Sequence, residues 1–481
     1  MSDTRKRNMT LIHLAVMLVI MFLIGSITPP APITSLGMKV LGIFVGLIYG
    51  WSAVGLIIPS LLGIAMLAAA TEVSINQIFA EGFGSNIVVL LIFILVFVAA
   101  INDADIGKVI ATWLLTRKFT IGRPWITSTT FFLAAFLVSA GVNSFGAIII
   151  CWGILYNICG SVGYKKGDAW PTFMVFGITI SAVLGSGSFA FKAVPMVIIG
   201  VYESLTKASV NLLSYSIFFW VLSFIIMAAI LLMGRFVFRI DTSLLKNVTE
   251  DMFNKSVLKL SKFQKVTFIF FLIMIVLLMI PSILPKNWAL AIILNKWGAT
   301  GIVIVVVMAM MCIQVEGKPL INFAKHAREG ILWDPIVLTA VALPLSSALM
   351  AEEAGISGWL KVALGPILNG QTELMFLFCA FGLALLLTNF SNNGMVGIIF
   401  MPIILSFCGT FGLNPGAMAV MLIFAVHIAL ITPASCPMSG LMFSNPEWIK
   451  PKDIYKFGFP TLIIALLVVV LIGNPLGSVL F

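Results

Sequence analysis

Long apolar runs, separated by short polar segments, occupy almost the whole chain. The main runs cover residues 9–27, 38–70, 87–100, 131–158, 173–202, 212–232, 266–284, 299–313, 336–350, 417–430 and 459–472. A membrane-spanning helix needs about 20 mostly apolar residues, and several of these runs are interrupted by polar residues, Gly or Pro. The pattern predicts an all-α integral membrane protein with about 11 transmembrane helices.

Two of the interruptions resemble each other. At an offset of 250 residues, segments 131–150 and 381–400 are identical at seven of twenty positions, and the one polar identity pairs Asn143 with Asn393. Each asparagine has small or polar neighbours inside an apolar run. Duplicated helices that break at mid-span are typical of transporters built from two inverted-topology repeats.

The repeat extends to both sides of these asparagines. Residues 87–115 and 336–364 each consist of two short apolar pieces around an acidic tip, and each predicts a re-entrant hairpin. The basic segment 241–265 predicts a cytoplasmic linker between an N-terminal repeat, 1–240, which includes an extra first helix, and a C-terminal repeat, 266–481.

Composition excludes a soluble globular domain. Hydrophobic residues make up 61% of the chain and charged residues only 10%, whereas about a quarter of a soluble protein is charged. The net charge of +10 comes from basic residues between apolar runs, as the positive-inside rule predicts, and no nucleic-acid partner is expected. Arg5-Lys6-Arg7 precedes the first run, which places the N-terminus in the cytoplasm of a multi-pass protein of the cell inner (plasma) membrane.

The order of hairpin, Asn-centred break and Thr-Pro turn, present in both halves, resembles the divalent anion:sodium symporter family of the ion-transporter superfamily. That family carries a Ser-Asn-Thr signature in each half. The matching triplets here are Val142-Asn143-Ser144 and Asn392-Asn393-Gly394, with Pro402 nine residues beyond Asn393. The family's Thr-Pro-Pro turn is similar to Thr432-Pro433-Ala434, and in the first half only Pro195 remains.

The resemblance implies an elevator-type carrier that forms a homodimer and transports small di- or tricarboxylates such as succinate, malate and citrate with sodium. Amides and hydroxyls at the two signatures would contact the substrate, and loop carbonyls would hold sodium. The substrate-binding candidates are Asn143, Ser144, Lys192, Asn392, Asn393, Gly394, Thr432 and Ser435. The sodium candidates lie near Asn143, Ser186, Gly187, Asn393 and Ala434, and no other cofactor is expected.

Lys192 departs from this pattern. A lysine at the centre of a bilayer costs about 2.5–3.5 kcal/mol, so it should face a cavity or a partner. Its ammonium could pair with a substrate carboxylate, or it could replace a sodium ion and make the protein a sodium-independent anion exchanger. The structural interpretation is that the alkyl chain of Lys192 extends through apolar surroundings and places its ammonium in water at the membrane surface.

The site residues also have purely structural interpretations. In addition, the predicted fold is compatible with transport of other substrates. The two asparagines could simply cap half-helices or bond to neighbouring helices. Arsenite or cation/proton transport is compatible with a related fold, although no carboxylate falls inside the broken helices or the long apolar spans to bind a proton. The three histidines, His13, His326 and His427, are scattered, so we expect no enzyme, and two broken repeats do not suggest a channel.

Overall fold

The computed structural model describes residues 3–117, 120, 122–247, 259–285, 287–368, 372–433 and 435–481. This part of the chain is helical except for a small hairpin of β1 (Gln314–Val315) and β2 (Lys318–Pro319). Twelve of its helices are long and apolar enough to cross a membrane, close to the predicted number. The chain is therefore a multi-pass membrane protein.

The same series of helices occurs twice. After α1 (Asp3–Gly25), the first half contains α2 (Ser35–Ala53), α3 (Ile57–Ala70), α4 (Ile75–Glu81), α5 (Asn86–Asp103), α6 (Ile106–Leu115), α7 (Pro124–Gly141), α8 (Ser144–Val162), α9 (Ala169–Ser186), α10 (Ala193–Thr206) and α11 (Leu212–Leu232). The second contains α12 (Lys262–Met279), α13 (Ala289–Cys312), α14 (Phe323–Gly330), α15 (Trp333–Met350), α16 (Ile356–Leu368), α17 (Glu373–Thr388), α18 (Asn393–Phe411), α19 (Pro415–His427), α20 (Pro437–Phe443) and α21 (Pro451–Val468), and α22 (Asn474–Leu480) ends the chain. Short α4 and α14, and short α6 and α16, stand at the same place in each series.

The hairpins are not where the apolar pattern predicts them. Helix α5 packs on α13 and α14, whereas α6 packs on α7 and α8, so the two halves of the hairpin predicted at 87–115 go to different parts of the molecule. The second predicted hairpin separates in a similar way, because α15 packs on α2 and α3 while α16 packs on α18. The pairs that do fold back on each other are α7 with α8 and α17 with α18. Asn143 and Asn393 therefore lie at hairpin turns, and not inside one broken helix.

The helices that do break are α9–α10 and α19–α20. Each ends at an irregular loop, residues 187–192 and 428–436, before the chain resumes as a helix. The second piece then crosses into the other half of the protein: α10 packs on α15 and α18, and α20 packs on α8 and α9. The two halves are thus interlocked through their broken helices.

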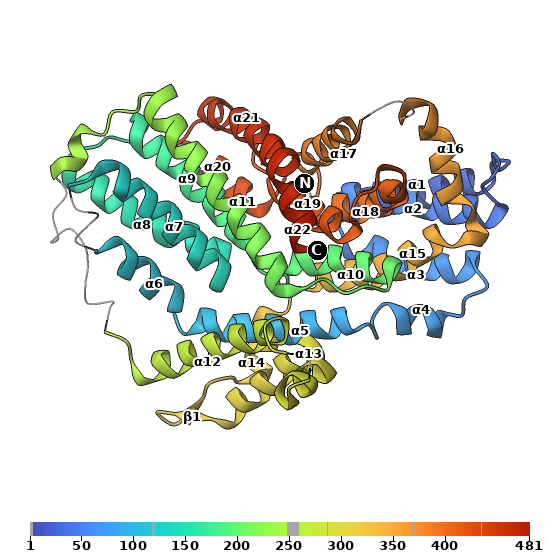
Figure 1. Cartoon of the computed structure of the whole chain (residues 1–481), viewed down its shortest axis with the longest axis horizontal. Helices are drawn as coiled ribbons and strands as arrows, with labels where there is room; N and C mark the ends of the chain where they lie inside the picture. Colours follow the sequence, from blue (N-terminus) through green and yellow to red (C-terminus); the bar gives the residue numbers. More distant parts are fainter. Residues whose placement is uncertain are drawn as a thin grey trace.

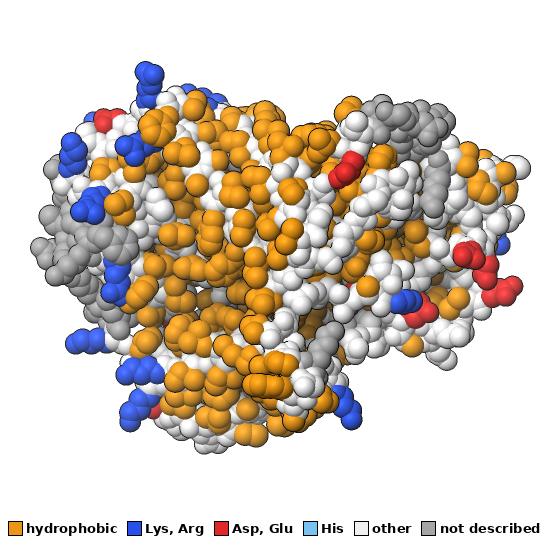
Figure 2. Space-filling model, in the orientation of Figure 1, with side chains coloured by type: hydrophobic (Ala, Val, Ile, Leu, Met, Phe, Trp, Pro, Cys, Tyr) orange, Lys and Arg blue, Asp and Glu red, His pale blue; other side chains and the backbone are white. Residues whose placement is uncertain are grey.

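The two hairpins are separated along the longest axis of the molecule, with α7 and α8 towards the left end and α17 and α18 to the right of the centre (Figure 1). Figure 2 shows hydrophobic side chains covering the middle of the same face. Most of the visible Lys and Arg lie towards the left end, and most of the visible Asp and Glu lie towards the right end. An apolar belt between charged ends is the surface that a bilayer requires.

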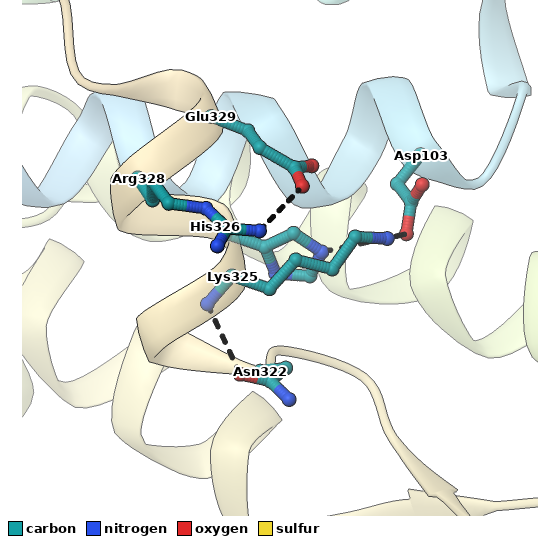
Figure 3. Close-up of polar contacts among 6 residues, drawn as sticks. All are labelled: Asp103, Asn322, Lys325, His326, Arg328 and Glu329. Atoms are coloured by element: carbon teal, nitrogen blue, oxygen red, sulfur yellow. Dashed lines mark hydrogen bonds and ion pairs between the residues drawn. The ribbon is translucent and has the colours of Figure 1, made fainter.

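An ion pair connects the end of α5 to the amphipathic helix α14 (Figure 3). The Lys325 ammonium lies 2.7 Å from Asp103 Oδ2, and His326 Nε2 lies 3.5 Å from the same oxygen. The hydrogen bond to the carboxylate raises the pKa of Lys325, so this lysine stays charged. Because α5 and α14 come from different halves, the pair helps to hold the halves together.

Glycines allow the backbones of the two halves to approach closely. A Cβ atom on Gly37 of α2 would lie 2.0 Å from the carbonyl oxygen of Ala354, and one on Gly82 would lie 2.1 Å from that of Ala340. Carbonyl oxygens in packed backbone cannot move aside as a flexible side chain can. Glycine is therefore required at both positions.

We expect Gly37→Ala to lower the free energy of unfolding by about 1–3 kcal/mol, the usual cost of overpacking, or to prevent folding. Thermal unfolding in detergent measures the effect. The control is Gly153→Ala in α8, where no atom lies within 4 Å of the added carbon and a small gain in stability is expected. Equal melting temperatures for wild type and Gly37→Ala would contradict the close approach.

Candidate functional site

The first hairpin turns at Val142 and Asn143, between α7 and α8. Asn143 is the N-cap of α8: its Oδ1 accepts a hydrogen bond of 2.6 Å from the Gly146 N–H. Its amide nitrogen donates to Oδ1 of Asn102, at the end of α5, over 2.7 Å. Both ends of the Asn143 amide are therefore held, and its orientation is defined.

The second hairpin has the same construction in a different register. Asn392 is the N-cap of α18 and accepts from the N–H groups of Gly394 and Met395, while Asn393 is the first residue of the helix. The counterpart of Asn143 is thus Asn392, 249 residues later, and the pairing of Asn143 with Asn393 at an offset of 250 is wrong by one residue. The cap defines the register, because one residue in each turn must supply the side-chain oxygen that binds the first free N–H groups.

A second pair of hydrogen bonds supports this register. Ser144 and Ser139 share a hydrogen bond of 2.9 Å, and Thr388 donates to Asn393 Oδ1 over 3.1 Å. In both turns the partners are five residues apart, one of them four residues before the cap residue and the other directly after it. Asn393, with 8% of its surface exposed, therefore takes the place of Ser144.

Lys192, in the loop between α9 and α10, reaches the first turn. Its ammonium donates to the carbonyl oxygens of Ser139 and Val142, over 3.2 and 3.3 Å. Both carbonyls belong to the C-terminal end of α7, where helix carbonyls lack partners and the helix dipole favours a positive charge. The lysine therefore points into the protein and does not extend to the interface.

In the second half, a neutral amide on the hairpin itself, that of Asn389, connects the turn to the broken loop. The Asn389 nitrogen donates to the carbonyls of Leu385 and Ile428, and its oxygen accepts from the N–H groups of Leu430 and Ile431. Thr432 adds a hydrogen bond from its hydroxyl to the Asn389 carbonyl. Asn389 thus fastens the end of α17 to the broken loop, and this half carries no charged side chain in its described residues at the position of Lys192.

Helix α10 brings the two turns together. Its N-cap residue is Lys192, which binds the first turn, and Val197 lies against Gly394 in the second turn. Five residues of α-helix advance about 7.5 Å along the axis. The two turns therefore lie on either side of the first turns of α10, and the N-termini of α8, α10 and α18 carry the partial positive charge of helix dipoles.

The remaining candidates have mainly local contacts. Ser186 bonds to the Val183 carbonyl and Ser435 to that of Thr432, while the Gly187 carbonyl accepts from the buried Tyr215 hydroxyl. Ala434 lies outside the described residues. Ser186, Ser435 and Gly187 therefore line the broken loops without an observed role beyond their own backbone.

Two ionisable residues inside the helices have structural contacts. His427 Nδ1 is bonded to the Ile423 carbonyl over 2.7 Å, as expected for a buried neutral histidine. Glu203 lies in α10, so the expectation that the broken helices contain no carboxylate is wrong in that case. Its carboxylate accepts from the Val210 N–H over 3.2 Å, just beyond the end of the helix.

An apolar pocket of about 460 Å³ lies next to the first hairpin, between α6, α7, α11 and α12. Its lining includes Trp113, Leu137, Phe189, Trp220 and Phe271, and the described residues around it contribute no charged side chain. Burying an unpaired carboxylate in such a space is costly. An anion site is better supplied by the hairpin turns than by this pocket.

Two residues of this network do not stand out in the sequence. Asn389 precedes the expected signature by three residues, and Asn102 belongs to a segment that the apolar pattern predicts to be a hairpin tip. The signal that could have found Asn389 is the density of amides between Asn389 and Asn393, where three of five residues are asparagine. Only the fold shows that Asn389 and Asn392 have different tasks.

Paired hairpins, broken helices and an apolar belt define a membrane transporter. The model of the citrate transporter family matches residues 47–394, and the chain belongs to this family, within the superfamily that contains the divalent anion:sodium symporters. The fold is similar to that of the YdaH transporter of Alcanivorax borkumensis, with a TM-score of 0.55 over 99% of this chain and 97% of that one, at 14% identity.

Several known transporters are distantly related. An uncharacterized transporter of Methanocaldococcus jannaschii, MJ0672, is 24% identical over 77% of this chain and 78% of its own length. The uncharacterized Escherichia coli transporter YfbS is 29% identical over 34% of this chain, and human solute carrier family 13 member 4 is 24% identical over the same share. These last two matches span only about a quarter of each relative, 26% and 25%.

We expect Asn389→Leu to lower the free energy of unfolding by roughly 4 kcal/mol or more, because it leaves four buried backbone groups without partners, at about 1–3 kcal/mol each. Thermal unfolding in detergent tests this. Asn414→Asp is the control: Asn414 caps α19 through its side-chain oxygen, which aspartate retains, so little change is expected. A stable Asn389→Leu protein would show that the loop is held by other contacts.

Proposed function

We propose that the protein is a secondary active transporter of small organic anions, such as the di- and tricarboxylates succinate, malate and citrate. The observation that supports this most directly is the meeting of two amide-capped hairpin turns with the N-terminus of α10. Three helix N-termini and one ammonium group provide positive potential at a place where no carboxylate of the described residues pairs with them. This arrangement suits an anion.

In this proposal, the side-chain amides of Asn143 and Asn393 donate to substrate carboxylates. An amide nitrogen carries two N–H groups, so Asn143 retains one donor after its bond to Asn102. Ser144, Asn392, Gly394, Thr432 and Ser435 complete the two turns, the glycine through its backbone. A substrate with carboxylates at both ends would reach both turns at once.

The coupling ion is the point at which the geometry favours exchange over symport. Sodium symport is what the family resemblance implies, and carbonyls at helix C-termini suit sodium. In the first half, however, the ammonium of Lys192 already bonds to the Ser139 and Val142 carbonyls. We infer that Lys192 supplies this charge permanently, which leaves only the second half for sodium and favours sodium-independent anion exchange.

The proposed mechanism is an elevator. The hairpins and broken helices, α7–α11 and α17–α21, would move as a transport unit against a scaffold of α1–α5 and α12–α15, with α6 and α16 as connecting arms. We propose a homodimer through the scaffold, in the inner (plasma) membrane. By the positive-inside rule, the end with most visible Lys and Arg faces the cytoplasm.

Uptake of labelled succinate, malate and citrate into proteoliposomes tests this function. We expect saturable uptake that is accelerated by internal unlabelled anion and changes little when sodium is replaced by choline. An absolute sodium requirement would select symport instead. Failure of all these acids, against empty liposomes as a control, would contradict the substrate class.

We expect Lys192→Met to reduce exchange by roughly 10- to 100-fold, because a hydrogen bond to a charged group contributes about 1.5–3 kcal/mol and the site loses its fixed cation. Lys165→Ala, in the exposed loop between α8 and α9, is the control with unchanged transport. In Lys192→Ala, we expect added sodium to restore part of the lost rate, since the smaller side chain frees the carbonyls. A fully active Lys192→Met protein would remove Lys192 from the mechanism.

A further inference from the structure

The turn between α5 and α6 is held from three directions by three consecutive residues. Asn102 accepts from the Asn143 amide of the first hairpin, and Asp103 binds Lys325 and His326 of α14 (Figure 3). The Ala104 carbonyl accepts from the Gln264 amide of α12 over 3.1 Å. Two of the three contacts fasten the turn to α12 and α14, and only that of Asn102 reaches the hairpin.

The hydrogen bond from Asn143 to Asn102 therefore joins two groups of helices. Helix α5 packs on α13 and α14, and its last turn is fixed to α14 by the Asp103 ion pair. The hairpin packs on α9 and on the arm α6. If the hairpin moves against α5 during transport, this bond must break, because Asn102 is held in place by its neighbours.

The second hairpin lacks an equivalent bond among the described residues. Helix α15 ends in Leu349-Met350, where α5 ends in Asn102-Asp103, so no amide stands at that position. Within the same part of the chain, the amide nitrogens of Asn392 and Asn393 make no hydrogen bond. The contact is thus a feature of the first hairpin, and the fold does not require it in both halves.

We propose that Asn102 is a latch that holds the first hairpin against α5 in the conformation described here and releases it during transport. The inference rests on the proposed function, because it assigns to Asn102 the control of the residue that is proposed to bind the anion. Asn102 acts through Asn143 as a positioning residue. Its acceptor oxygen also keeps the nitrogen end of the Asn143 amide, and not the oxygen, on this side of the turn.

Three variants test the latch. Asn102→Leu keeps the size of the side chain and removes the acceptor, while Asn102→Asp keeps the acceptor and makes the bond charge-assisted, hence stronger. Gln264→Leu is the matched control, because it removes a different side-chain contact to the same turn without touching the hairpin. All are made in the full chain and compared with wild type.

The first measurement is hydrogen–deuterium exchange of the ligand-free protein in detergent. We expect Asn102→Leu to increase exchange in residues 139–147 by about two- to tenfold, the range for loss of one neutral hydrogen bond, and to leave residues 388–395 unchanged. Asn102→Asp should decrease exchange in the first segment, and Gln264→Leu should change neither. This measurement needs no substrate, so it tests the latch even where the proposed carboxylates fail.

The second measurement is anion exchange in proteoliposomes at saturating substrate. Asn102→Leu should raise the maximal rate by about two- to tenfold and Asn102→Asp should lower it, whereas a merely structural role would lower the rate in both. Unchanged hydrogen–deuterium exchange at residues 139–147 in both Asn102 variants would overturn the latch. So would an Asn102→Leu protein that raises KM without a change in hydrogen exchange, because Asn102 would then be a ligand of the anion. If Asn102→Leu does not fold, Asn102→Asp alone tests the latch, through the expected decrease in hydrogen–deuterium exchange at residues 139–147 and in the maximal transport rate.

Discussion

A helix that ends inside a membrane leaves backbone carbonyl and N–H groups without water, and the centre of this protein depends on how those groups are paired. Eight helix ends lie there, because each of the two hairpin turns and two broken loops joins two helices. Asparagine side chains bind several of them, since one amide can both accept from backbone N–H groups and donate to backbone carbonyls. Asn143 caps α8, Asn392 caps α18, and Asn389 binds the Leu385 carbonyl of α17 together with one carbonyl and two N–H groups of the second loop.

The two halves differ in the charge of the side chain that joins the hairpin to the broken loop. The end of α7 binds the ammonium of Lys192 from the first broken loop, whereas the end of α17 is joined to the second broken loop by the neutral amide of its own C-cap residue, Asn389. In the proposed function, a fixed cation would compensate part of the charge of a bound anion whether or not a metal ion is present. The asymmetry also extends to the hairpins, since within the described residues only the first is bonded to α5 through Asn102.

The interlocking of the halves explains why these contacts form. Helix α10 begins beside the first hairpin and then packs on α15 and α18 of the second half, so that one short helix touches both turns. Close backbone approaches at Gly37 and Gly82 bring the remaining helices of the two halves together. The site is thus a product of the interface between the repeats, and neither repeat contains it alone.

The sequence by itself determined the class of protein, the doubled order of elements, and the asparagines, the Thr432 loop and Lys192 as residues to examine, because apolar length and repetition are local properties. It misplaced the hairpins. Segments 87–115 and 336–364 each have an acidic tip between two apolar arms, as a true hairpin has. Whether the two arms pack on each other depends on tertiary contacts that the pattern does not contain. It also paired Asn143 with Asn393. That alignment rests mainly on identical apolar residues, which do not show which asparagine of the second turn caps the helix. Only the tertiary structure decided which asparagine caps a helix, which carbonyls Lys192 binds and that Asn102 reaches the hairpin, since all three depend on contacts between residues about 40 to 50 positions apart or on the geometry of a turn.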